Sequence, residues 1–83
     1  MSLPNKVKNN LPTQIGEEKS HKFDFPVLNI VIKVKKTGSD LYQLSVYLPT
    51  GSSGGLEKFW KYDKSVPQSE LDAAFAGFAI RFD

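Results

Sequence analysis

The residues best suited to chemistry in this 83-residue chain are lysines that alternate with apolar and aromatic residues in its central part. A lysine ammonium group neutralises a phosphate, and the flat ring of a tyrosine or phenylalanine can stack on a base. These residue types at strand spacing indicate a surface that binds nucleic acid. The candidate binding residues are Lys33, Lys35, Tyr47, Lys58, Phe59, Trp60 and Lys61.

Residues that commonly catalyse reactions or ligate metals occur here without the partners that they would need. The chain has no cysteine and a single histidine, His21, so neither a thiolate zinc site nor a histidine-based metal site is expected. We expect His21 to lie in solvent. The acidic residues lie in lysine-rich segments or near the start of a helix, and no serine occurs in a nucleophile-elbow pattern. The sequence therefore predicts a protein that is not an enzyme, with no catalytic residue, cofactor or metal.

Charge is distributed unevenly along the chain, although the net charge is only +2. Residues 33–64 contain six lysines and three acids, a balance of +3, whereas residues 65–83 contain one arginine and three acids, a balance of −2. A basic strand region beside an acidic helix favours an anionic partner for the strands.

The same surface has two other interpretations. Lysines are common on solvated strand faces, where they also deter aggregation at sheet edges. Alternatively, Val31, Leu41, Tyr47 and aromatic residues near position 60 could form an apolar patch that buries against another protein. The alternative function is therefore a protein-interaction domain, such as a small inhibitor, adaptor or self-associating subunit, that uses this face or a sheet edge.

Side-chain alternation predicts the strands that should position these residues. The run from Pro26 to Lys36 predicts a strand with two unlike faces. The face expected to be buried holds Leu28, Ile30, Ile32 and Val34. The opposite face, expected to be wet and basic, holds Asn29, Val31, Lys33 and Lys35. A turn at residues 37–40 should lead into a second strand over residues 41–48, which buries Tyr42, Leu44, Val46 and Leu48.

A third strand is expected over residues 56–62, after a long flexible loop at residues 49–55. Its register has two solutions. One turns Leu56, Trp60 and Tyr62 inward together with Lys58, whereas the other buries only Phe59 and leaves Trp60 outside to stack on a base. We favour the first register because it buries more apolar area.

A C-terminal helix is predicted to begin near Ser65, which would cap it. One apolar stripe then recurs at helical spacing and consists of Leu71, Phe75, Phe78 and Phe82. Gly77 and the strand-like alternation of Phe78, Ile80 and Phe82 leave a second solution open, in which the helix ends near Ala76 and a short strand follows.

The expected fold is α+β, a small antiparallel sheet of three to four strands with one C-terminal helix packed on one face. Residues 1–22 show no apolar period and are expected to form a disordered or flexible tail, and residues 23–83 a single small domain. Over residues 25–83, this order of consecutive strands and one helix resembles the plan of single-stranded-DNA-binding transcriptional coactivators and of the arm-binding domains of phage integrases. The resemblance assigns no site residue.

The length of the chain and the signals that it lacks predict its partners and its location. About sixty residues must supply the whole core, which favours binding to a partner or formation of a homodimer. The sequence shows neither a secretory signal nor an apolar stretch of the roughly twenty residues that a membrane span requires. We therefore expect a cytoplasmic protein that does not bind membranes and has nucleic acid or another protein as its partner.

Overall fold

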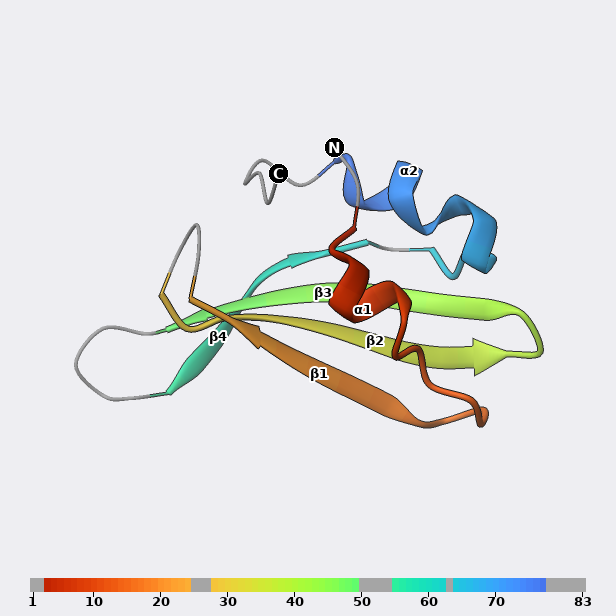
Figure 1. Cartoon of the computed structure of the whole chain (residues 1–83), viewed down its shortest axis with the longest axis horizontal. Coiled ribbons are helices and arrows are strands. Elements are labelled where there is room, and N and C mark those ends of the chain that lie inside the picture. The colour runs from red at the N-terminus through yellow and green to blue at the C-terminus, as the bar shows by residue number, and fades with distance from the viewer. Residues whose placement is uncertain (1–2, 25–27, 50–54, 63, 78–83) are drawn as a thin grey trace.

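The computed structural model describes residues 3–24, 28–49, 55–62 and 64–77 and shows a four-stranded antiparallel sheet in the order β1-β2-β3-β4 (Figure 1). The strands are β1 (Glu18–Phe23), β2 (Ile30–Gly38), β3 (Leu41–Pro49) and β4 (Leu56–Lys61). Two short helices, α1 (Asn5–Lys8) and α2 (Leu71–Phe75), lie over one face of the sheet. The predicted small α+β fold is confirmed. None of the helices in the described ranges is long and apolar enough to cross a membrane.

The central hairpin β2–β3 follows the predicted alternation. Ile32 pairs with Val46, and both lie in the core beneath the helices. Leu28 was predicted to face the core but is 65% exposed, because it lies in a turn with Asn29 before β2 begins. The backbone of Asn29 has a φ of 63°, a left-handed conformation that asparagine tolerates better than most residues and that interrupts the strand.

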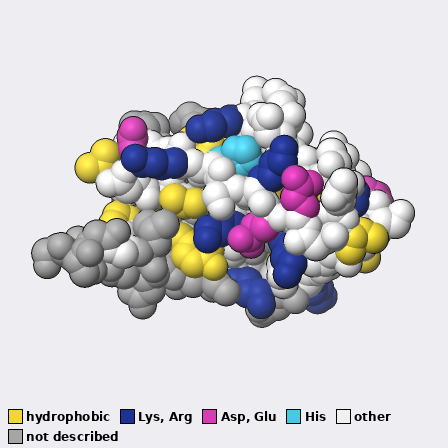
Figure 2. Space-filling view, turned by 90° about the horizontal axis from the view of Figure 1, so that it is seen from below, with side chains coloured by type: hydrophobic (Ala, Val, Ile, Leu, Met, Phe, Trp, Pro, Cys, Tyr) yellow, Lys and Arg dark blue, Asp and Glu magenta, His cyan; other side chains and the backbone are white. Residues whose placement is uncertain are grey.

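The N-terminal segment differs most from expectation, because the predicted tail over residues 1–22 supplies part of the fold. Strand β1 pairs with β2 from Glu18–Lys35 to Phe23–Ile30 and forms one edge of the sheet. Seen from this edge, lysine and acidic side chains are interspersed over the surface (Figure 2). Charged residues of this kind protect an edge strand against pairing with other chains.

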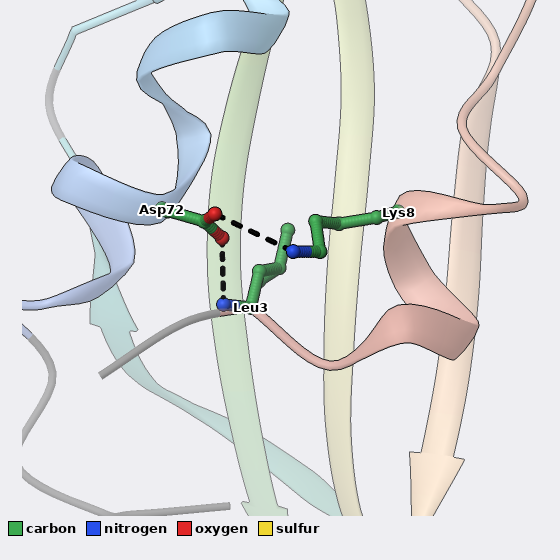
Figure 3. Close-up of polar contacts among 3 residues, drawn as sticks. All are labelled: Leu3, Lys8 and Asp72. Atoms are coloured by element: carbon green, nitrogen blue, oxygen red, sulfur yellow. Dashed lines mark hydrogen bonds and ion pairs between the residues drawn. The ribbon is translucent and has the colours of Figure 1, made fainter.

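A carboxylate on α2 holds the start of the chain in place. Asp72 accepts a hydrogen bond from the backbone N–H of Leu3 at 2.8 Å, and its other oxygen lies 3.4 Å from Lys8 Nζ (Figure 3). Leu3, which is 1% exposed, and Val7 are buried in the core. One turn of helix is not stable by itself, so α1 depends on this packing, and four helical residues are too few to produce an apolar period in the sequence.

His21 is buried on the helix-covered face of β1, opposite Ile32, and not in solvent as predicted. Its exposed fraction is 8%, and its Nε2 atom has no hydrogen-bond partner in the structure. Burial lowers the pKa of His21 and the nearby Lys6 ammonium lowers it further, against a backbone hydrogen bond with Asn10 that raises it. The neutral imidazole is therefore the form that suits this position.

The C-terminal helix begins later than predicted. Ser65 does not cap it but lies 2.8 Å from the hydroxyl of Thr37, and Val66 forms an isolated β-bridge with Tyr42. A single 3-10 turn, η2 (Gln68–Glu70), then leads into α2, which buries Leu71 and Phe75 as expected. The choice between helix and strand for residues 78–82, including Phe78, Ile80 and Phe82, lies outside the described residues, as does most of the loop predicted at 49–55.

Candidate functional site

The face of the sheet opposite the helices carries residues from all four strands, and strand pairing arranges them in rows. One row crosses the sheet from edge to edge and consists of Ser20, Lys33, Ser45 and Lys61. The row on one side of it consists of Glu18, Lys35 and Gln43, and the row on the other side of Lys22, Val31 and Tyr47. We call these ten residues the open face.

The structure places four of the predicted binding residues, Lys33, Lys35, Tyr47 and Lys61, together on the open face. Lys22, on a strand that the sequence did not predict, adds a fourth lysine. Glu18 is the single carboxylate among the ten residues, so the face has a clear excess of positive charge. Lys35 and Lys61 are exposed to solvent, whereas Lys33 is half-buried.

Tyr47 supplies the aromatic surface of this face, and a lysine covers part of it. The Nζ atom of Lys33 lies 4.3 Å from the centroid of the Tyr47 ring, a cation–π contact. Such a contact contributes about 0.5–1 kcal/mol at an exposed site, whereas stacking of a base on an aromatic ring contributes about 1–3 kcal/mol. The contact with Lys33 is therefore weaker than the stacking of a base on such a ring.

A hollow of about 190 Å³ lies in the open face. Its lining consists of Glu18, Lys35, Gln43, Ser45, Tyr47 and Lys61. Ser45 occupies the middle of β3, with a lysine directly across from it on each neighbouring strand. Because serine has a short side chain among long ones, the surface is recessed at this point. The lining is mainly polar, and five of its six residues carry a hydrogen-bond donor, a composition that suits an oxyanion.

Trp60 does not belong to this face. It pairs with Val46 on the helix-covered side, where its ring packs edge-on against Phe75 with centroids 6.3 Å apart. This is the register that apolar burial favours, and Tyr62 packs against the same core. Trp60 therefore stabilises the fold and is not available to stack on a base at the open face.

Two other predicted site residues lie where β4 is irregular. The pairing steps from Val46–Trp60 to Tyr47–Lys58, which leaves Phe59 as the extra residue of a bulge. The side chains of Lys58 and Phe59 lie outside the described part of the structure, so these residues are placed only by their backbone.

The apolar patch considered as a protein interface is interrupted. Val31 is only 8% exposed, because its cross-strand neighbours Lys22 and Tyr47 have long side chains that flank it. Leu41 is exposed, but Gln43 and Ser45 separate it from Tyr47 along β3. Among the described residues, the open face is therefore polar and basic, without a continuous apolar surface.

Sequence reasoning missed the contribution of β1 to the open face, because residues 1–22 were assigned to a tail. A signal was present, since Ser20 and Lys22 alternate with His21 and Phe23 in the pattern of a half-buried strand. Four residues are too short a pattern to outweigh the surrounding polar sequence.

No known protein family, curated protein or solved structure matches this chain. Within the described residues, no group of three or more potential metal ligands lies together. A proposal for the function must therefore rest on the chemistry of the open face.

Proposed function

We propose that this chain is a nucleic-acid-binding module that holds a single strand on its open face. The observation that carries the proposal is the set of four lysines on a sheet face that no described helix covers, two of which, Lys35 and Lys61, line a polar hollow. Lysines on such a face neutralise backbone phosphates and release the counterions condensed on them, which is the main source of affinity in sequence-independent binding.

The shape of the face favours a single strand over a duplex. The row from Ser20 to Lys61 crosses three strand spacings, about 14 Å. The grooves of a duplex admit a helix or a two-stranded ribbon, but a four-stranded face is too broad to enter one. Unpaired bases, by contrast, can lie flat on a sheet and stack on a ring such as that of Tyr47.

Fluorescence anisotropy with a labelled oligonucleotide of about 15 nucleotides, single-stranded or annealed to its complement, tests the proposal. We expect tighter binding of the single strand, with affinity that falls as salt rises. Each phosphate contact contributes about −0.7 to the slope of log K against log salt for a single strand, so four lysines predict a slope of about −3. Absence of salt-sensitive binding at high micromolar protein would refute the proposal. Formation of a dimer in light scattering without oligonucleotide binding would favour the protein-interaction alternative.

Matched lysine variants separate a defined site from general charge attraction. Lys35→Gln and Lys61→Gln should each make the slope of log K against log salt less negative by about 0.7. Lys19→Gln is the control, because it removes the same charge from the covered face of β1, where Lys19 pairs with Val34. An equal loss in the control would show that net charge and not the open face attracts the strand.

Removal of the ring tests the stacking contribution. Tyr47→Ala should weaken single-strand binding by about 1–3 kcal/mol, equivalent to about fivefold to 150-fold, while the salt slope changes little. If the slope of log K against log salt changed but the affinity at high salt did not fall, stacking on Tyr47 would be contradicted.

A further inference from the structure

The hollow in the open face has the chemistry of a subsite for one anionic group. Lys35 and Lys61 can donate charged hydrogen bonds into it, and the Ser45 hydroxyl and Gln43 amide can donate neutral ones. A cation would meet two ammonium groups against one carboxylate, and an apolar ligand would have to desolvate the polar lining. An oxyanion is the ligand class that gains from these donors together.

Strand geometry allows both lysines to reach one group. Lys35 pairs with Gln43 and Lys61 pairs with Ser45, so the two lysines stand on opposite sides of β3 and one row apart. Their Cα atoms are then about 12 Å apart, from two strand spacings across the sheet and two residues along it. Flexible four-carbon side chains can converge over β3 from that distance and hold an anion between them.

Glu18 weakens the attraction of the hollow for oxyanions, most strongly for those of high charge. Its carboxylate also lines the hollow and repels every anion there in proportion to the charge of that anion. A phosphodiester carries one negative charge, whereas a free phosphate monoester carries about 1.5–2 at neutral pH. At about 8 Å in water, one such repulsion costs about twofold in affinity, and two charges about fivefold. Because Lys35 and Lys61 attract an anion in the same proportion, Glu18 lowers the preference of the hollow for a highly charged anion without reversing it, and the singly charged diester loses least affinity to this repulsion.

We infer that the hollow beside Ser45 is a phosphodiester subsite that fixes one backbone phosphate of the bound strand through Lys35, Lys61, Gln43 and Ser45. The inference rests on the proposed function, because the diester comes from the nucleic acid held on the open face. It adds a defined anchor point that lysines spread over the face would not provide.

Two serines of the same cross-strand row supply a matched test. Ser45→Val fills the hollow and removes its hydroxyl, whereas Ser20→Val makes the same change on β1, outside the hollow lining. Oligonucleotide anisotropy should show about tenfold weaker binding for Ser45→Val and a smaller loss for Ser20→Val, because Ser20 lies on the open face but outside the hollow lining. Ser45→Thr, which keeps the hydroxyl, should lie between wild type and Ser45→Val. Equal affinity of the two valine variants would overturn the subsite.

Titration of the ¹⁵N-labelled protein with small anions separates failure of the subsite from failure of the proposed function. Dimethyl phosphate, a monoanionic diester, should shift the amide resonances of residues 43–47 in wild type and Ser20→Val but not in Ser45→Val. These shifts without oligonucleotide binding would support the subsite and refute nucleic acid as the partner. Oligonucleotide binding without these shifts would leave the proposed function standing and refute the subsite.

Glu18→Gln provides a test in which binding improves. The variant should bind inorganic phosphate about fivefold more tightly and dimethyl phosphate about twofold more tightly, because the dianion loses more repulsion. An equal effect on the two anions, or weaker binding of both, would contradict the role assigned to Glu18.

Discussion

Replacement of Leu3 by alanine is the most direct test of whether the N-terminal segment belongs to the core. Leu3 is almost completely buried and packs in the same cluster as Val7, Leu71 and Phe75. Truncation of a buried leucine to alanine costs about 2–5 kcal/mol, from lost burial and from the cavity that remains. A position outside the helices and strands can relax more than one in mid-strand, so we expect about 2–3 kcal/mol. A chain of this length has a total stability of about 4–12 kcal/mol, of which this is a large part.

Urea unfolding followed by the fluorescence of Trp60 measures the loss. Trp60 is the only tryptophan and packs against Phe75, so its emission reports on the core. Ile15→Ala is the control, because Ile15 lies in the same N-terminal segment but is 66% exposed, and we expect a change within about 0.5 kcal/mol. If Leu3→Ala destabilises no more than this control, Leu3 behaves as part of the tail that the sequence predicted over residues 1–22, and its packing in the core is refuted.

Three further predictions concern the pH response, the N-terminal contact and the turn before β2. Stability should decrease as the pH falls from about 7 to 5, because the pKa of buried His21 is lowered in the folded state, so that the unfolded chain, in which histidine has a pKa of about 6.5, takes up the proton first. His21→Gln should flatten this part of the plot of urea midpoint against pH. A plot parallel to that of the wild type would contradict the prediction. Asp72→Asn should lower the free energy of unfolding by about 1 kcal/mol in the same assay, because it removes the ion pair with half-exposed Lys8 and weakens the hydrogen bond from the Leu3 amide. An unchanged urea midpoint would show that Asp72 does not hold the N-terminal segment in place. Asn29→Ala should lower the free energy of unfolding by about 1 kcal/mol, whereas Asn29→Gly should leave it unchanged, because glycine and asparagine readily adopt a φ of 63° and alanine does not. Equal urea midpoints for the two variants would contradict the left-handed turn.

Much of the central sheet could be predicted because its signals are local. The alternation of Ile30, Ile32 and Val34 with lysines defines both faces of β2, and the turn at residues 37–40 defines its partner β3. The inward register of Trp60 also followed from the sequence, because the larger apolar area decides which side of a strand is buried.

The errors arose where burial depends on partners that are distant in the sequence. Leu3 and Val7 are isolated apolar residues among polar ones, and only packing against the core residues of the sheet and of α2 buries them. His21 has the sequence context of a surface residue, but in the structure it is buried beside Lys6 and Asn10 of the N-terminal segment. Conversely, Leu28 continues the apolar alternation of β2 but lies in a turn, because a single left-handed residue outweighs the local pattern.

By itself, the sequence determined which side chains of β2 and β3 share a face, and with them the basic character of that face, since alternation is a property of the extended backbone. Only the tertiary structure decided that Glu18 and Lys61, from opposite edges of the sheet, line the same hollow beside Ser45. Strand order and register bring these residues together, and both are set by how the whole chain buries its apolar surface. A local pattern holds no information about that arrangement.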